Sequence, residues 1–142
     1  MGKIQRLTDI EIMIMKILWE HNNGLTIQEI TSYIEGKKVS VASVGQAIKH
    51  MIKKEAVKVC DYVQVSNVYA RKFSTCFGQE EFLAAEFHRL QKSVFGNKKL
   101  HTAGITAAFL DNSEDEELEL DEINELEKII SQKKKKLKEI EK

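Results

Sequence analysis

Residues 40–73 read SVASVGQAIKHMIKKEAVKVCDYVQVSNVYARKF. The first part has the apolar spacing of an amphipathic helix that opens on Ser40 as its N-cap, and it becomes basic toward its end. The second part has two runs rich in β-branched and aromatic residues, separated by the polar residues 64–67, which is typical of a hairpin. The stretch therefore predicts a helix over 40–54 followed directly by a β-hairpin over 57–73.

The helix predicted over residues 40–54 has two different faces. Apolar side chains recur at positions i, i+3, i+4 and i+7, and the face expected to be buried comprises Val44, Ala47, Ile48, Met51 and Ile52. The opposite face is small or uncharged near the start of the helix and carries lysines farther along. An ordinary solvated surface would also carry Lys49, Lys53 and Lys54, so the lysines alone do not establish a binding site.

Two helices are predicted ahead of this stretch, over residues 7–21 and from residue 26 to a stop at Gly36, with Lys37 and Lys38 at an exposed corner. Their apolar residues also recur at helical spacing, and the expected buried stripe of the second helix includes Tyr33. Each helix opens on a threonine that can form a capping box with a glutamate three residues later, namely Thr8 with Glu11 and Thr26 with Glu29.

Three helices followed by a hairpin have the order of a winged helix-turn-helix, in which the third helix enters the major groove. The expected fold is mainly α with a small β-hairpin, and residues 1–78 are its winged-helix, DNA-binding domain. Small side chains at the start of the third helix suit contact with bases, and the later lysines suit phosphates. The residues expected to contact DNA are Ser40, Ala42, Ser43, Gln46, Lys49, His50, Lys53, Asn67 and Arg71.

The hairpin contributes the last two of these residues. Asn67 stands at the expected tip, where asparagine tolerates a left-handed conformation. Arg71 follows Tyr69 on the returning strand, and either Arg71 or Lys72 is expected to face solvent beside an aromatic ring. Basic residues on this arm favour contact with phosphate or the minor groove, although the hairpin could instead only cover the edge of the core.

From residue 79 onward the chain predicts a helical dimerisation domain. Apolar residues at helical spacing indicate three helices, over residues 79–95, 98–110 and 121–141, separated in part by the acidic stretch 111–121. Three such helices have little to pack on within one chain, so we expect two subunits to exchange contacts in a homodimer. The predicted domains are therefore residues 1–78 and residues 79–142.

The net charge is zero, but the two predicted domains differ in sign. Residues 1–78 carry 11 Lys and Arg against 7 Asp and Glu, while residues 79–142 carry 11 against 15. The basic first part permits a nucleic-acid surface, whereas the acidic second part does not favour phosphate. The basic run at Lys133–Lys136 is explained by its position near the C-terminal end of the last helix, where cations compensate the helix dipole.

Several classes of protein are disfavoured by the sequence. Polar residues follow Met1 and no apolar run approaches the roughly 18 residues of a membrane span, so we expect a cytoplasmic protein. The two cysteines, Cys60 and Cys76, are expected to be reduced thiols, and no metal or cofactor is expected; a redox-sensing or metal-sensing role for them stays open. The histidines are scattered and no catalytic motif occurs, so we do not expect an enzyme.

Several strings of this chain, in their order, resemble the penicillinase repressor family, which includes β-lactamase, methicillin-resistance and copper-transport repressors. The resemblance covers nearly the whole chain. The matching residues are LTDIE (7–11), MKILWE (15–20), TIQEI (26–30), Ser40, Ser43, Val44, Ile48, Met51, Lys53, Lys54, EEFL (80–83) and LDEINEL (120–126).

This resemblance implies a homodimeric transcriptional repressor that binds a palindromic operator, with the helix over 40–54 in the major groove and the wing over 57–73 beside it. In the β-lactam branch, a protease linked to a membrane sensor cuts the dimerisation region between asparagine and phenylalanine. Its release site corresponds here to Ala108 and Phe109, with alanine in place of the asparagine. In the copper branch a C-terminal cysteine cluster exchanges metals, and this chain has no cysteine after Cys76.

The third helix departs from the family pattern as well. Ala42 and Gly45 stand where the family has basic and threonine residues, and His50 is near a typical arginine position, so we expect a different operator. Glu55 replaces a usual glycine, so the turn into the wing is expected to differ.

The leading hypothesis is a DNA-binding repressor; the alternative is a winged-helix module whose third helix contacts another protein. The target genes and the inducing signal are not encoded in any recognisable motif.

Overall fold

The computed structural model describes residues 3–34, 39–96, 101–111 and 120–141. The chain forms two compact units, Met1–Gly96 and Asn97–Lys142, which are described separately. The expected stop of the second helix at Gly36, the corner at Lys37 and Lys38, and most of the acidic stretch 111–121 lie outside the described residues. The first unit contains the predicted winged-helix domain and is called the head.

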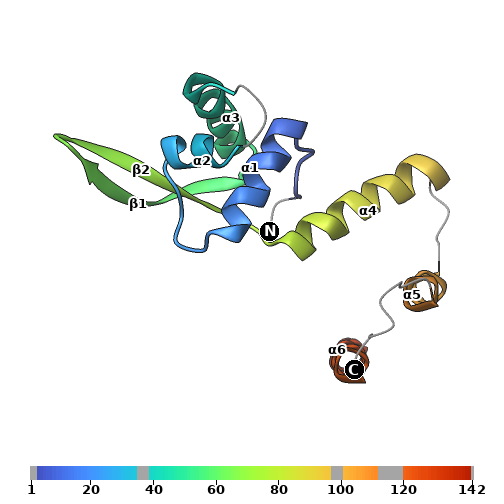
Figure 1. The fold of residues 1–142 in the computed structure, drawn as a ribbon. Coiled ribbons are helices and arrows are strands. Elements are labelled where there is room, and N and C mark those ends of the chain that lie inside the picture. The colour runs from blue at the N-terminus through green and yellow to red at the C-terminus, as the bar shows by residue number, and fades with distance from the viewer. Residues whose placement is uncertain (1–2, 35–38, 97–100, 112–119, 142) are drawn as a thin grey trace. The chain divides into compact units, whose positions relative to one another are not determined.

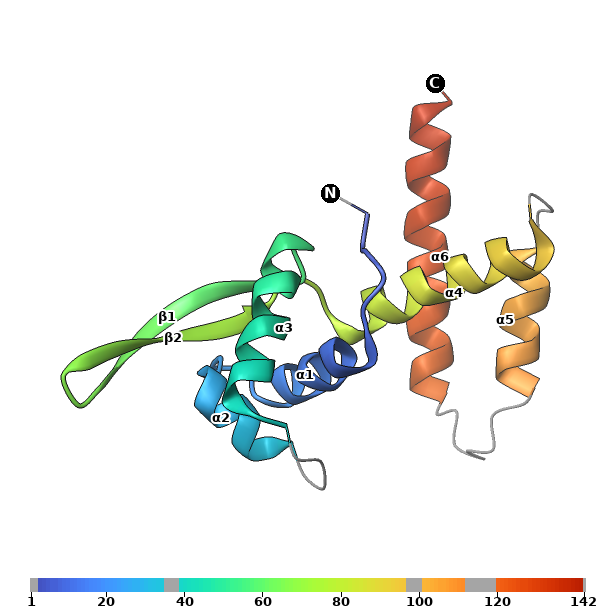
Figure 2. The ribbon, with the colours of Figure 1, turned by 90° about the horizontal axis from the view of Figure 1, so that it is seen from above.

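The head consists of three helices, a two-stranded antiparallel hairpin and a fourth helix (Figures 1 and 2). In chain order its elements are α1 (Asp9–Glu20), α2 (Ile27–Tyr33), α3 (Val41–Lys53), β1 (Val57–Val65), β2 (Val68–Thr75) and α4 (Gln79–Phe95). Both views show the hairpin projecting away from the cluster of α1, α2 and α3. The predicted fold class, mainly α with a small hairpin in winged-helix order, is confirmed.

The expected helix caps are present. The Thr8 and Thr26 hydroxyls accept hydrogen bonds from the backbone N–H groups of Glu11 and Glu29, whose carboxylates accept from the threonine N–H groups in return. The Ser40 hydroxyl accepts a hydrogen bond from the Ser43 backbone N–H at 3.1 Å. Each cap satisfies a backbone donor that a helix start would otherwise leave free, which is why these three helices begin where the sequence predicted.

One apolar core joins α1, α2, α3 and the base of the hairpin. Its fully buried members include Ile14, Met15, Ile30, Val44, Met51 and Phe73. Phe73 also anchors β2, because its backbone N–H and C=O pair with the C=O and N–H of Leu25 at 2.8 and 3.1 Å. The hairpin is therefore attached at its base by side-chain burial and backbone hydrogen bonds, while its far end extends beyond the core.

Three details differ from the sequence expectations. Ile52 is 37% exposed rather than buried, because it lies at the edge of the apolar arc of α3 near the helix end. Tyr33 is exposed and packs on the His21 ring, with 4.4 Å between ring centroids. The strands extend to the pair Val65–Val68, which leaves a two-residue turn, and the positive φ of 56° belongs to Ser66 rather than Asn67.

Glu55 takes the left-handed conformation that the family's glycine would suit, with φ 59°. The Glu55 N–H donates to Ile52 C=O at 3.0 Å, and the Ala56 N–H donates to Met51 C=O at 2.9 Å. These two hydrogen bonds form a Schellman motif, with Ala56 and Met51 both buried beneath it. The turn into the wing is therefore a glycine-type helix end occupied by glutamate, which carries a steric cost.

We expect the Glu55→Gly variant to be more stable than the original chain by about 1 kcal/mol. This is the difference between about 1–2 kcal/mol for a left-handed non-glycine residue and about 0.4–1 kcal/mol for the greater unfolded-state freedom of glycine. Urea unfolding measures the change. Glu55→Ala is the matched control, because it removes the charge and keeps the strained conformation; a gain equal to that of Glu55→Gly would refute the backbone explanation.

A buried ion pair connects α1 to the end of α3. Glu11 is 2% exposed, and its Oε1 accepts hydrogen bonds from Lys54 Nζ at 2.6 Å and from the Thr8 N–H at 2.8 Å. Lys54 Nζ also donates to the Arg6 backbone C=O at 3.0 Å. The sequence grouped Lys54 with Lys49 and Lys53 as surface lysines, but Lys54 compensates a buried carboxylate, so this assignment is corrected.

Within the head, helix α4 begins against α1. Trp19 Nε1 donates to the Phe77 backbone C=O at 2.9 Å, and the Phe82 ring lies 5.8 Å from the Trp19 ring. Farther along, Arg89 donates to the Ile4 C=O and pairs with Glu86. The compact unit therefore continues to Gly96. The predicted boundary between residues 78 and 79 separates a DNA-binding part from a dimerisation part by function, and that division stays a prediction.

The second unit contains α5 (Thr102–Asp111) and α6 (Leu120–Ile140), close to the predicted helices over 98–110 and 121–141. Among the described residues of α4, α5 and α6, none is buried. Within the described ranges, no helix combines the length and the apolar character needed to span a membrane.

Candidate nucleic-acid interface

The exposed face of α3 carries the residues that the sequence assigned to DNA contact. Val44, Ala47, Ile48 and Met51 are buried, which fixes the rotation of the helix about its axis. The opposite face consequently exposes Ser40, Ala42, Ser43, Gln46, Lys49, His50 and Lys53. The structure therefore brings these residues together on one surface; their contact with DNA stays a prediction.

This face is basic toward its C-terminal end. Helix α3 contains no acidic residue, and among the described residues neither Lys49 nor Lys53 forms an ion pair. Near the N-terminal end, the Ser40 and Ser43 hydroxyl oxygens are 2.9 Å apart, so the two side chains use part of their hydrogen-bonding capacity on each other. Gln46 lies between these regions and is exposed, with an amide suited to a base edge.

The hairpin places Asn67 in its turn and Arg71 on β2, both exposed. The guanidinium carbon of Arg71 lies 5.5 Å from the centroid of the Phe73 ring. The expectation of a solvent-facing cation beside an aromatic ring is confirmed, with Phe73 rather than Tyr69 as the recorded ring. Arg71 and Phe73 stand two positions apart on β2 and so share one face of the strand.

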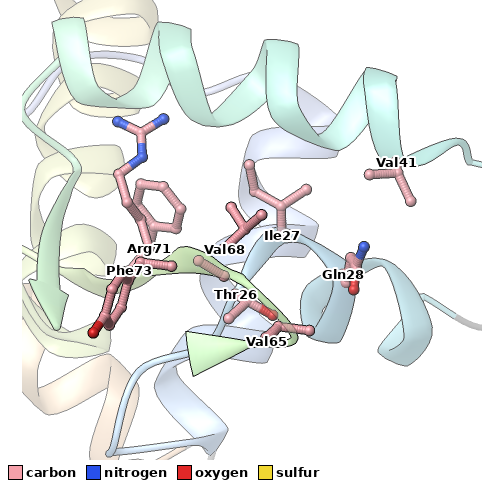
Figure 3. Close-up of a pocket in the computed structure, with 10 residues that line it drawn as sticks. Thr26, Ile27, Gln28, Val41, Val65, Val68, Arg71 and Phe73 are labelled. Atoms are coloured by element: carbon pink, nitrogen blue, oxygen red, sulfur yellow. The ribbon is translucent and has the colours of Figure 1, made fainter. Parts of the chain in front are cut away.

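A groove separates the hairpin from α2 and the start of α3 (Figure 3). It has a volume of about 450 Å³, and we call it the wing groove. Its walls include Ile27, Val41, Val65, Val68, Arg71 and Phe73. Sequence reasoning missed it, although Val65 and Val68 gave a signal: they flank the turn, pair with each other across the hairpin and so place two apolar side chains together at its tip.

The possible proteolytic release site lies within a regular helix. Ala108 and Phe109 lie within helix α5 and are exposed, so the peptide bond between them is part of a helix. Cleavage there stays a prediction.

Cys60 and Cys76 are free thiols, and partial burial raises the pKa of Cys76. Within the described part of the chain, no three His, Cys, Asp or Glu side chains are grouped so that they could hold a metal ion.

Two solved structures are similar over most of the chain. The adhesin competence repressor of Streptococcus pyogenes is 16% identical, with a TM-score of 0.40, and the match covers 93% of this chain and 81% of that one. A point mutant of Lactococcus lactis ZitR is 20% identical, with a TM-score of 0.39 and coverage of 100% and 82%.

Among curated proteins, no sequence matches this chain. The model of the penicillinase repressor family, in contrast, matches residues 7–132. The match spans α1 to α3, the wing, α4, α5 and the first part of α6. It confirms the resemblance seen in the ordered sequence strings, and the protein belongs to the penicillinase repressor family of DNA-binding transcriptional repressors.

Proposed function

We propose that this protein is a homodimer that represses transcription by binding a palindromic operator, with α3 of each head in one half-site and the hairpin beside it. The observation that carries the proposal is the exposed face of α3, which has no acidic residue and is held outward by a buried opposite face. A two-fold dimer presents two such faces in matching orientations, which suits an inverted repeat.

The composition of α3 supports a division of roles along the helix. Ala42 and Ser43 are small enough for a close approach to base edges near the helix start, and the Gln46 amide suits adenine. Lys49 and Lys53 follow one and two turns later, where point charges suit the phosphate backbone. The first group would select the sequence, while the lysines would contribute affinity that is independent of sequence and sensitive to salt.

We expect Lys49→Ala to weaken binding to all duplexes by a similar factor and to reduce the slope of log affinity against log salt by about one. Gln46→Ala should instead reduce discrimination between duplexes with little change in slope. Fluorescence anisotropy with labelled duplexes at several salt concentrations measures both. Lys16→Ala, which removes an exposed charge from α1, is the control. Absence of duplex binding at low salt would refute the proposal.

The same titration distinguishes the proposed DNA-binding repressor from the alternative, a module whose α3 contacts another protein. Phosphate contacts release counterions, so affinity for DNA falls steeply as salt is added. A complex in which α3 meets a protein surface does not show that steep dependence. The acid-free face of α3 favours DNA.

Helix α6 supports the dimer. Its apolar residues repeat with heptad spacing, and the resulting seam comprises Ile123, Leu126, Ile130, Leu137 and Ile140. None of them is buried, and Ile130 and Ile140 are 61% and 80% exposed. A stripe of this kind is expected to be covered by a second helix, because apolar surface removed from water contributes about 25 cal/mol per Å².

The charges of α6 favour an antiparallel pair. Residues 121–127 carry four acidic side chains, whereas residues 128–138 carry six lysines. One of these, Lys133, occupies the heptad position between Ile130 and Leu137 of the seam. An antiparallel pair places each acidic half against a basic half, while a parallel pair opposes like charges and brings the two Lys133 ammonium groups together. In the antiparallel register, Leu126 lies opposite Leu137 of the partner subunit.

We expect disulfide cross-linking to report this arrangement. With Cys60 and Cys76 replaced by serine, chains carrying Leu126→Cys mixed with chains carrying Leu137→Cys should form a cross-linked dimer under mild oxidation. Either variant alone should remain largely unlinked, since Leu126 does not face its own copy. Non-reducing electrophoresis and sedimentation measure the outcome. Efficient self-linking of Leu126→Cys would show a parallel pair, and a monomer by sedimentation would refute the dimer.

A further inference from the structure

We propose that the wing groove binds a small amphipathic carboxylate, an organic acid with an aromatic or branched apolar body, and that this ligand displaces DNA. Binding itself is independent of the proposed function, whereas displacement of DNA rests on it. The two parts are therefore tested by separate measurements on the full-length protein.

The groove has the size and the lining of a ligand site. Its volume of about 450 Å³ lies within the range of roughly 300–1,000 Å³ that is typical of small-molecule pockets. Ile27 projects from α2, Val41 from the start of α3 and Val65 and Val68 from the hairpin (Figure 3). Val68 is 69% exposed and Val41 is 49% exposed, so an apolar body placed here would remove substantial apolar surface from water.

Arg71 determines the charge of the ligand. It lies on the groove wall, and among the described residues it forms no ion pair, its recorded contact being the Phe73 ring. A guanidinium presents paired donors that match a carboxylate, and apolar walls reduce the screening of that interaction by water. A neutral or cationic ligand of the same shape would gain no electrostatic attraction from the guanidinium. The groove therefore favours an anionic head group above an apolar body.

The position of the groove connects ligand binding to DNA binding. Val41 directly precedes Ala42 and Ser43, which lie on the face of α3 that is proposed to contact DNA, and Arg71 is itself a proposed phosphate contact. A carboxylate on Arg71 would occupy that charge, and an apolar body between Val41 and Val68 would hold the hairpin away from α3. Occupation of the groove and engagement of DNA are thus expected to exclude each other.

The test uses two probes of nearly equal shape, 2-naphthoate and the neutral 2-naphthylmethanol. Each is titrated into the isotopically labelled full-length protein while amide chemical shifts are followed by NMR. We expect naphthoate to shift the amides of Val41, Val68 and Arg71 and to bind about tenfold more tightly than the alcohol. Shifts confined to α4, α5 and α6 would overturn the site, because they would show binding to the exposed apolar helices.

Two variants test the role of the charge. Arg71→Met keeps the apolar stem and should bind naphthoate and the alcohol with about equal affinity. Lys72→Met removes a neighbouring charge from the same strand, on the opposite face, and should retain the preference. A preference that survives Arg71→Met, or that Lys72→Met abolishes equally, would overturn the assignment. The amide spectrum of each free variant reports directly whether its fold is intact.

A competition experiment then separates the two parts of the proposal. Naphthoate should release a labelled duplex from the original protein at low salt, and the alcohol should release it about tenfold less effectively. If naphthoate binds the groove without releasing DNA, the regulatory part is wrong and the site stands. If DNA binds and shifts the groove amides while naphthoate does not, the groove belongs to the DNA interface: the inference fails and the proposed function survives. Absence of DNA binding refutes the proposed function and, with it, the displacement of DNA, whereas the naphthoate titration still decides whether the groove is a ligand site.

Discussion

The Lys54→Met variant should lose about 2–3 kcal/mol of its free energy of unfolding at pH 7. This is less than the roughly 3–5 kcal/mol for breaking a fully buried ion pair, because the Lys54 side chain is 24% exposed. Methionine retains most of the apolar stem, so the change isolates the ammonium. Without it, Glu11 Oε1 keeps only its hydrogen bond from Thr8, and Glu11 Oε2 is already buried with no partner among the described residues. Urea unfolding at one protein concentration measures the loss.

A double variant provides the control. In Lys54→Met/Glu11→Gln the buried charge is absent, so part of the lost stability should return, whereas independent sites would show additive losses. The partial cap at Thr8 persists because the glutamine oxygen still accepts its N–H. Additive losses would mean that the 2.6 Å contact between Lys54 and Glu11 contributes nothing specific.

The same pair predicts a pH dependence. Burial raises the pKa of Glu11. Together, the Lys54 ammonium and the Thr8 N–H and hydroxyl lower this pKa by more than burial raises it, so the pKa lies below the ordinary value. The ionised pair therefore stabilises the fold above the unfolded pKa of about 4.3, and this stability is lost as the pH falls through the lower folded pKa. In Lys54→Met only the burial and the Thr8 contacts remain, so the pKa of Glu11 should rise and the deficit should shrink on acidification.

The Gly24→Ala variant should be destabilised by about 2–3 kcal/mol, the sum of a left-handed alanine and local overpacking. Gly24 has φ +78°, and a Cβ at this position would stand 2.5 Å from Cys60 Sγ and 3.2 Å from the Phe73 C=O. Gly24 therefore allows the connection before α2 to pass close to the base of the hairpin. Thermal or urea unfolding measures the effect.

Cys60→Ala separates the two contributions to the Gly24→Ala effect. It removes Sγ, so the double variant Gly24→Ala/Cys60→Ala should recover the overpacking part, about 1–2 kcal/mol, and keep the backbone part. Cys60→Ala alone should have little effect, because the residue is exposed and its recorded hydrogen bond is a 3.5 Å contact from Sγ to the Lys72 C=O. Equal losses in the single and double variants would show that the backbone conformation alone requires glycine.

Much of the local structure was predictable because its causes are local in sequence. Thr8, Thr26 and Ser40 begin their helices through hydrogen bonds to residues only three positions away. The rotation of α3 followed from helical spacing, with Ile52 as the exception at the edge of the stripe. Asn67 was expected at the hairpin tip as a residue that tolerates a left-handed conformation, and it does lie in the turn, but the positive φ belongs to Ser66. Residue preference alone does not determine which turn position becomes left-handed.

The sequence by itself determined the order of helices, the hairpin, the outward face of α3 and the family, since periodicity, caps and ordered strings are all properties of neighbouring residues. Only the tertiary structure decided that Lys54 pairs with Glu11, which is 43 positions away, and that Gly24 meets Cys60. It also assembled the wing groove from α2, α3 and the hairpin. Such contacts depend on how elements pack against each other, and no local pattern specifies that packing.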